Sequence, residues 1–226
     1  MLDERLALAA SLYEPCEWGA DIGTDHAYLP CHLLLSGICR HMIAADVSPG
    51  ALRHARETLA RASLLGRTDI VLADGLDAIT RPCGCISIMG MGGENMAEIL
   101  SKGQKRLQGA VLVLSAHTDL PLVRRCLPKI GYAIVQERLC FAAGRYYIIW
   151  RAEPGQQDMT EADVRYGQLL WEEPAELLTG YVQHRIHVLS GILRGHLAAA
   201  VPDQSAIDEL TEDIAFYQHQ LEVLTC

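Results

Sequence analysis

The segment that most constrains the fold is Asp21–Pro30, which reads DIGTDHAYLP. It follows a short apolar run, contains Gly23 and leads into a predicted helix. The next apolar run ends at an acid, Asp46, 23 residues after Gly23. A strand, a glycine turn, a helix N-terminus and an acid at the end of the second strand form a cradle for a nucleotide cofactor. The turn brings backbone N–H groups close to the ligand, and the acid accepts hydrogen bonds from ribose hydroxyls. We therefore predict a nucleotide-cofactor site at this turn.

Apolar runs that alternate with helical patterns indicate an α/β fold with a mainly parallel sheet. The predicted parallel strands cover residues 18–22, 41–47, 70–73, 85–89 and 110–114. Two further β-rich runs, 132–140 and 145–150, are joined by a link too short for a crossover helix, so we predict an antiparallel hairpin. A parallel sheet that ends in a reversed hairpin resembles the Rossmann-like class I methyltransferases, whereas NAD-type Rossmann domains normally end on a parallel strand. The hairpin therefore favours S-adenosylmethionine (SAM) over NAD.

The C-terminal part of the chain has a helical pattern that follows a linker at residues 153–157. Apolar side chains recur at heptad spacing along two segments, which predicts an antiparallel helical hairpin similar to a coiled coil. The two stripes are Leu178, Val182, Ile186, Leu189, Leu193 and Leu197, and Ile207, Leu210, Ile214, Tyr217, Leu221 and Leu224. We predict a cofactor-binding domain at 1–153 and a helical domain at 154–226.

Charge and cysteine content limit the partners and the compartment. The net charge of -9 argues mildly against nucleic-acid binding, although it leaves room for a local basic face. No apolar run reaches the ~18 residues that a membrane span needs, and the first residues lack a cationic signal-peptide start. The eight cysteines are scattered, and the one close pair, Cys83-Gly84-Cys85, has no second pair to complete a zinc site. We expect a cytoplasmic protein with no membrane and no metal.

The predicted cofactor contacts follow the ends of the first three strands. Asp21 would receive the ammonium group of SAM, and Gly23 would allow close approach of the backbone. Asp46 would bind the ribose, and Val47 would pack on the adenine ring. Asp74-Gly75 would recognise adenine, with the carboxylate accepting from its N6 amine. Each feature also has an ordinary explanation: a strand-end acid at Asp21, a plain turn at Gly23 and a common Asp-Gly turn at Asp74.

Asp25 departs from the general SAM-binding pattern, which has small glycines at positions 25 and 27 of this chain. Ala27 is a small substitute, but Asp25 adds a carboxylate beside the cofactor. This carboxylate could help to hold a sulfonium ligand or act as a base. It could equally cap the helix that follows, and the two roles are compatible.

The fourth strand ends in Gly90-Met91-Gly92-Gly93, where the acceptor would meet the methyl group. Enzymes that methylate exocyclic amines of bases usually place Asn/Asp-Pro-Pro-aromatic here, because a conjugated amine needs carbonyl acceptors. A ring nitrogen has an in-plane lone pair and needs less help. The glycine-rich floor therefore favours a ring nitrogen as the acceptor, and a merely flexible turn is the alternative.

Together, DIGTDHAYLP at 21–30, Asp46-Val47-Ser48, Ala73-Asp74-Gly75-Leu76 and the IMGMGG string at 88–93 resemble the TrmK family of bacterial tRNA (adenine(22)-N1)-methyltransferases. The resemblance implies methyl transfer from SAM to N1 of an adenine in the D arm of tRNA. It places one set of residues around SAM: Asp21, Gly23, Asp46, Val47, Asp74, Gly75 and Gly90. It places another set on the acceptor side: Asp25 and His26 as catalytic candidates, with Tyr28, Met91, Gly92 and Gly93 as substrate contacts.

One segment departs from the family pattern. Where members often have a Gln-Pro-Asn-like segment after the fifth strand, this chain has Ser115-Ala116-His117-Thr118. Two explanations stay open: a different use of His117, and a shifted substrate. Basic groups for tRNA docking are available in the first half of the chain at Arg53, Arg56, Arg61 and Arg67. Two other functions stay open: a SAM enzyme that acts on a small molecule or protein, and a non-catalytic SAM-binding module. We expect a monomer or a weak homo-oligomer.

Overall fold

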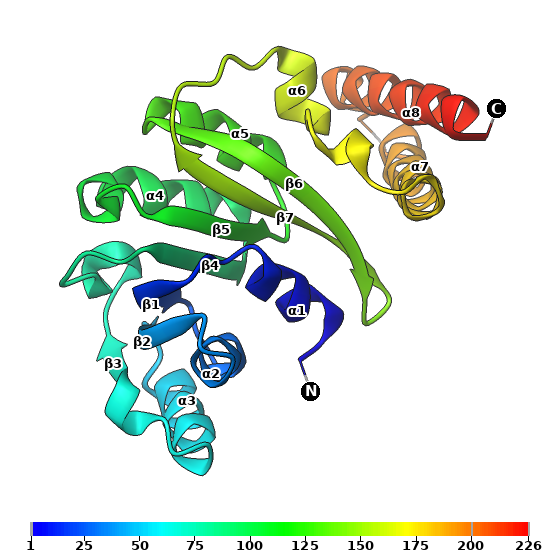
Figure 1. Ribbon diagram of the computed structural model, residues 1–226. Coiled ribbons are helices and arrows are strands. Elements are labelled where there is room, and N and C mark those ends of the chain that lie inside the picture. Colours follow the sequence, from blue (N-terminus) through cyan, green and yellow to red (C-terminus); the bar gives the residue numbers. More distant parts are fainter. Residues whose placement is uncertain (1, 200, 226) are drawn as a thin grey trace. The chain divides into compact units, whose positions relative to one another are not determined.

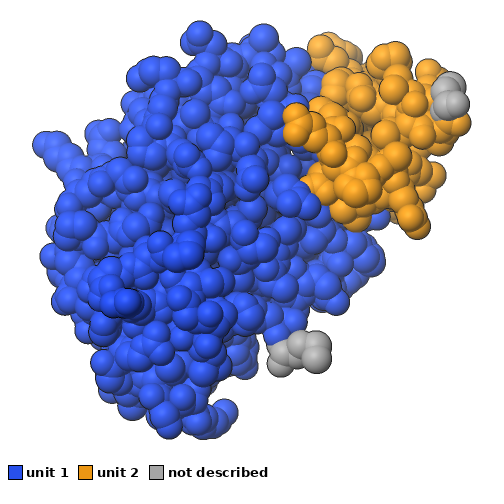
Figure 2. Space-filling model, viewed as in Figure 1, with its two compact units in different colours: residues 1–170 blue, residues 171–226 orange. Residues whose placement is uncertain are grey.

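The computed structural model describes residues 2–199 and 201–225. Cys226, one of the eight cysteines, lies outside the described residues. The chain divides into two compact units, residues 1–170 and 171–226 (Figure 2). The predicted domain boundary at 153/154 lies at the end of the last strand, β7, whereas the two compact units divide after Leu170. Which parts of the chain fold independently stays a prediction.

The first unit is built on a seven-stranded sheet with the order β3-β2-β1-β4-β5-β7-β6 (Figure 1). The strands are β1 (Cys16–Ile22), β2 (Cys39–Asp46), β3 (Thr68–Leu72), β4 (Cys85–Met91), β5 (Val111–Ala116), β6 (Tyr132–Ala142) and β7 (Arg145–Pro154). β1 to β5 are parallel, and β7 pairs antiparallel with both β5 and β6. The predicted α/β fold with a terminal reversed hairpin is therefore confirmed.

Helices cover both faces of this sheet (Figure 1). The helices of the first unit are α1 (Glu4–Ser11), α2 (Tyr28–Leu35), α3 (Pro49–Arg61), α4 (Gly93–Leu107), α5 (Leu120–Lys129) and α6 (Glu161–Tyr166). On one face, α1, α2 and α3 bury a core that includes Leu33, Leu59 and the β2 residue Met42. On the other face, α4 and α5 pack through Leu100, Leu127 and other fully buried side chains. Burial on both faces explains why the central strands read as continuous apolar runs.

Local signals set two helix starts that position the site. The Asp3 side chain accepts a hydrogen bond of 2.7 Å from the backbone N–H of Leu6, so it caps α1 as its sequence position suggests. α3 begins with Pro49, whose fixed φ suits the first helical turn. Ser48 caps this helix by accepting from the N–H of Ala51 at 3.3 Å.

A buried ion pair holds the segment after β7 against the sheet. Arg124 of α5 donates to Glu137 of β6 at 2.5 Å, and both side chains are 1% exposed. Trp150 Nε1 donates to the same carboxylate at 2.7 Å, and the backbone N–H of Leu170 donates to its other oxygen at 3.2 Å. Arg124 also donates to the carbonyl of Val164 at 3.2 Å. These bonds explain why residues 155–170 belong to the first unit.

The second unit is a helical hairpin of α7 (Ala175–Leu197) and α8 (Gln204–Thr225). Leu178, Val182 and Leu189 of the predicted α7 stripe are buried, whereas Leu197 at its end is exposed. Tyr217 of α8 is buried and meets the ring of Tyr181 edge-on at 6.2 Å. Within the described residues, no helix combines the length and the apolar character that crossing a bilayer requires.

Candidate active site

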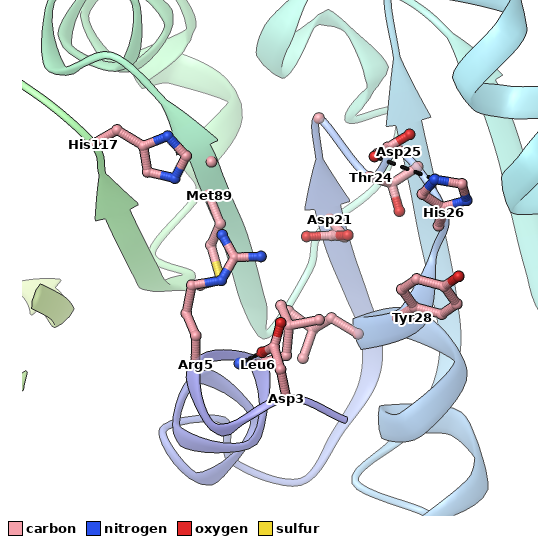
Figure 3. Close-up of a pocket in the computed structure, with 13 residues that line it drawn as sticks. Asp3, Arg5, Leu6, Asp21, Thr24, Asp25, His26, Tyr28, Met89 and His117 are labelled. Carbon is pink, nitrogen blue, oxygen red and sulfur yellow. Dashed lines mark hydrogen bonds and ion pairs between the residues drawn. The ribbon is translucent and has the colours of Figure 1, made fainter. Parts of the chain in front are cut away.

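The candidate site is a cleft of about 380 Å³ at the carboxyl ends of β1 and β4 (Figure 3). From β1 the chain first continues to β2 and β3 on one side of the sheet, and then returns to β4 and β5 on the other side. Open α/β sheets bind their ligands at such a switch point. The cleft is lined by Asp3, Arg5, Leu6, Asp21, Gly23, Thr24, Asp25, His26, Tyr28, Leu29, Met89, Gly90 and His117.

Asp21 lies in the middle of this cleft and is only 6% exposed (Figure 3). Ser87 of β4 donates to Asp21 Oδ1 at 2.5 Å, and the hydroxyl of Tyr13 donates to Ser87 at 2.7 Å. Burial raises the pKa of the Asp21 carboxyl, although the hydrogen bond from Ser87 opposes the rise. A buried carboxylate is stabilised by a cation, so this position suits the ammonium group predicted for it.

The loop after β1 is fastened to β2 by its backbone. The N–H groups of Gly23 and Thr24 both donate to the carbonyl of Ala45, at 2.9 and 3.0 Å. Gly23 has a φ of 76°, and a β-carbon there would lie 3.3 Å from Cε of Met91. Asp25 and Ala27 also adopt left-handed φ values of 45° and 53°. Non-glycine residues pay strain for this conformation, which is concentrated at functional sites.

The alternative role of Asp25 as a helix cap is wrong. α2 begins after Ala27, the cap position, and no side chain accepts a hydrogen bond there. The left-handed backbone at Ala27 turns the chain so that Asp25 stays outside the helix. Its carboxylate instead lies 3.7 Å from Nε2 of His26, and both side chains are open to solvent (Figure 3).

His26 is part of a stack of three parallel rings. Its ring centroid lies 5.3 Å from that of Tyr28, with 12° between the planes, and 4.7 Å from that of His54, with 7° between the planes. Donor atoms of Asp25, His26 and His54 lie within 4.8 Å of one another. Imidazole lone pairs lie in the ring plane, and nearly parallel planes do not aim them at one ion. The expected absence of a metal stays a prediction.

Asp46, the predicted ribose acid, is fixed beside this loop. Its Oδ1 accepts from the N–H of Ser48 at 2.8 Å, and its Oδ2 accepts from the N–H of Asp25 at 3.3 Å. The neighbouring Val47 is 65% exposed. An apolar side chain left in the open next to the acid is available to pack on a ligand ring.

Asp74 and Gly75 lie in a separate, smaller cleft of about 120 Å³, between the end of β3 and α4. Gly75 has a φ of 51°, and a β-carbon there would lie 3.0 Å from the side chain of Ile99. Because β3, β2 and β1 are neighbours in the sheet, Asp74, Asp46 and Asp21 lie in this order at the carboxyl ends of the three strands. The predicted cofactor residues follow one edge of the sheet without sharing one cavity.

The glycine-rich floor has two parts. Gly90, with a φ of 79°, is exposed in a bulge of β4, and it lines the cleft. Gly92 precedes α4, and Gly93 is buried as the first residue of that helix. Gly93 donates to the carbonyl of Thr118 at 2.9 Å, and a β-carbon there would lie 2.6 Å from the same oxygen. Substrate contact by Met91, Gly92 and Gly93 stays a prediction.

Seven cleft residues are absent from the predicted site residues, and two of them, Arg5 and His117, carry basic side chains. Arg5 of α1 brings a guanidinium group into the cleft, and it also lies over the ring of Tyr147 at 5.2 Å. His117, from the segment that departs from the family pattern, lines the cleft opposite His26 (Figure 3). Partial burial lowers the pKa of His117, and the charges of Arg5 and Arg145 lower it further. The only sequence signal for His117 was the departure itself, and nothing signalled Arg5.

Comparison with known proteins decides the family. The sequence model of TrmK, described as tRNA (adenine(22)-N(1))-methyltransferase, matches residues 19–218. The chain belongs to the TrmK family. The resemblance noted from its motifs is confirmed, and the chain is a methyltransferase of the Rossmann-like class.

Individual TrmK relatives agree with this assignment. The tRNA (adenine(22)-N(1))-methyltransferase of Bacillus subtilis (strain 168) is 32% identical over 159 residues, which covers 70% of this chain and 67% of the relative. The structure of Streptococcus pneumoniae Sp1610, to which a tRNA (m1A22) methyltransferase activity has been ascribed, has a TM-score of 0.87 and 30% identity over 98% of this chain and 100% of that one. The same protein has been solved with S-adenosyl-L-methionine, with a TM-score of 0.85, 29% identity and the same coverage.

Proposed function

We propose that this protein transfers the methyl group of SAM to N1 of adenine 22 in bacterial tRNA. The observation that carries the proposal is the row of Asp74, Asp46 and Asp21 along one edge of the sheet, which leads to the cleft floor at Gly90. An adenosyl ligand with an amino-acid tail needs an acceptor for its adenine amine, one for its ribose and one for its ammonium group, in that order. The row supplies three carboxylates in the matching order.

The surrounding residues fit such a ligand. Val47 offers an exposed apolar surface next to Asp46, and Gly75 lets the backbone after β3 pack closely on Ile99, which lines the same small cleft as Asp74. Gly23 and Gly90, both with positive φ, line the cleft and expose backbone to it. The relative Sp1610 binds S-adenosyl-L-methionine with a closely similar fold.

Asp25, His26 and Tyr28 line the cleft, and in this proposal they form its acceptor side. SAM supplies a methyl group that is already activated by the sulfonium charge, so the protein's main task is to position adenine N1. N1 lies on the pairing edge of the base, and flipping the nucleotide into the cleft would expose it. The exposed ring of Tyr28 is suited to stack on a flipped base.

Methylation at N1 leaves a positive charge on the adenine ring. In this proposal, the Asp25 carboxylate stabilises that charge or accepts the proton from N6. His26 lies beside this carboxylate and is held in the ring stack by His54. Arg5, on the other side of the cleft, is placed to meet a phosphate or carboxylate group.

The partner and the compartment follow from the same proposal. The substrate would be tRNA, and the enzyme would act in the cytoplasm, where tRNA is processed. We keep the prediction that the protein works without a metal, as a monomer or a weak homo-oligomer.

The test is a methylation assay with labelled SAM and bacterial tRNA that lacks the modification. The expected product is N1-methyladenine at position 22, located by a reverse-transcription stop. A matched transcript with guanine at position 22 should accept no label. Label at another position, or none on either transcript despite measurable SAM binding, would overturn the proposal.

A further inference from the structure

Two thiols face each other at the amino ends of β1 and β2, whereas the cleft lies at the carboxyl ends of the strands. Cys16 and Cys39 are the first residues of β1 and β2, and they are direct partners in the parallel register. Their Sγ atoms lie 3.4 Å apart. Neighbouring strands lie ~4.8 Å apart, and this spacing is within the Cα–Cα range that a disulfide bridges. Closing the sulfurs to ~2.05 Å needs only a small movement at two strand ends.

The Cys83-Gly84-Cys85 motif has a place in this arrangement. A β-carbon at Gly84 would lie 2.6 Å from Cβ of Cys16, so the glycine leaves the room that Cys16 occupies. Cys83 turns to the carbonyl of Arg81, at 3.6 Å. In the part of the chain that the structure describes, Asp25, His26 and His54 are the only set of three or more metal-type donors within 4.8 Å of one another. Of these sulfurs, Cys16 and Cys39 are the close pair, with 3.4 Å between their Sγ atoms.

The two thiols are unequal. Cys39 is fully buried, whereas Cys16 is partly open to solvent. The hydrogen bond with Cys39 lowers the pKa of the Cys16 thiol, although partial burial opposes this effect. The same hydrogen bond and burial raise the pKa of Cys39. An accessible thiol with a lowered pKa beside a second thiol is the arrangement found in redox-sensitive cysteines.

We propose that Cys16 and Cys39 are a site of reversible oxidation by hydroperoxides, which converts the pair into an intramolecular disulfide between β1 and β2. The Cys16 thiolate attacks one peroxide oxygen, the O–O bond breaks, and Cys16 becomes a sulfenic acid while water leaves after taking up a proton. Cys39 then attacks the Cys16 sulfur, the S–O bond breaks, and the hydroxyl leaves as water with the proton of Cys39. In total, two thiols and one hydrogen peroxide give one disulfide and two waters.

The experiment uses the reduced full-length protein and hydrogen peroxide. Remaining thiols are alkylated, and the digested protein is analysed by mass spectrometry. We expect a peptide that links Cys16 to Cys39, and its loss on treatment with dithiothreitol. Cys39→Ser should stop at the sulfenic acid, which dimedone traps on Cys16. Cys31→Ser is the matched control, because Cys31 is also partly exposed but its pKa is raised by burial, and this variant should form the same link.

Three outcomes would overturn the proposal. In the first, Cys16 and Cys39 are both alkylated while Cys31 or Cys140 is oxidised. In the second, the disulfide links Cys16 to Cys83 or Cys85. In the third, the Cys16→Ser variant carries a dimedone adduct on Cys39. The wild-type mapping decides the matter even if a serine at buried Cys39 prevents folding. The readout is independent of methyl transfer, so it holds whatever the substrate is.

Discussion

The backbone N–H of Asp25 donates a hydrogen bond of 3.3 Å to Oδ2 of Asp46, 21 residues later. This bond joins the residue proposed for the acceptor side to the residue proposed for the ribose. The second oxygen of Asp46 is held by the N–H of Ser48 at 2.8 Å. The carboxylate is therefore oriented before any ligand arrives, which reduces the entropy lost on binding.

Asp46→Asn should weaken SAM binding by about 10- to 100-fold, because hydrogen bonds to a charged group contribute ~1.5–3 kcal/mol. In the variant, the asparagine NH2 group would also face one of the two backbone N–H donors, of Asp25 or Ser48, that bind the carboxylate oxygens of Asp46. Isothermal titration calorimetry measures the effect. Asp69→Asn is the matched control, since Asp69 is in β3 and pairs with Arg81 at 3.0 Å. Equal affinity of the Asp46→Asn and wild-type proteins would remove Asp46 from the site.

Asp25→Asn should slow methyl transfer by about 100-fold, the scale of a lost general base or charge partner, while SAM affinity is retained. Asparagine tolerates the left-handed φ at this position, so the loop conformation is preserved. Single-turnover methylation at saturating tRNA gives the rate. Asp119→Asn makes the same substitution at another left-handed residue that does not line the cleft. A wild-type rate in the Asp25 variant would exclude the role.

Asp21→Asn should lower SAM affinity at least about tenfold, since the ammonium group loses its charged partner, and yet stabilise the protein without ligand at neutral pH. Burial raises the folded-state pKa of Asp21. Protonated Asp21 contributes fully to the free energy of unfolding below the pKa of an aspartate in the unfolded chain, ~3.9. This contribution is lost as the pH rises through the higher pKa of Asp21 in the folded protein. The gain in Tm of the variant should therefore be small in acid and grow toward pH 7. Thermal melts across this range without SAM check the sign, and a variant less stable than wild type at pH 7 would contradict it.

Gly93→Ala should destabilise the fold by ~1–3 kcal/mol, because a methyl group there would press on the backbone of Thr118 and Asp119. Gly92→Ala should fold normally, since its β-carbon would lie 3.2 Å from the movable hydroxyl of Thr118. Urea unfolding separates the two. Gly66→Ala, at a site with open space, controls for the effect of alanine itself. A fully stable Gly93→Ala protein would show that the packing at α4 can adjust.

Binding of tRNA should weaken steeply with salt, as phosphate contacts require. Arg53 and Arg56 are exposed on α3, the helix that brings His54 to the ring stack. Charge reversal at these two positions should reduce both the affinity and the salt slope. Arg40→Glu is the control, because Arg40 lies near the start of β2, at the edge away from the cleft. A flat salt response in filter binding would count against tRNA as the substrate.

The sequence predicts the scaffold well because its signals are local. Continuous apolar runs mark the parallel strands, and the short link before Arg145 allows only a reversed hairpin. Asp3 marks a helix start through its side-chain carboxylate, and Pro49 marks one through its fixed φ. Each of these features depends on residues that are neighbours in the chain.

What the sequence misses depends on packing between distant segments. Arg5 reaches the cleft because α1 packs against α2 and the β6–β7 hairpin. His54 meets His26 because α3 lies beside the loop after β1. The left-handed backbone at Ala27, which excludes Asp25 as a cap, has no glycine to announce it. The pairing of Arg124 with Glu137 is likewise invisible, because neither residue marks itself as buried in the sequence.

That buried pair also limits how the protein can change over generations. Loss of either partner alone leaves an uncompensated charge in the interior, which typically costs ~3–5 kcal/mol. Replacement of both together by apolar residues of similar size is often harmless. Selection should therefore remove single substitutions at Arg124 or Glu137. Replacement of the pair requires substitutions at both positions at nearly the same time.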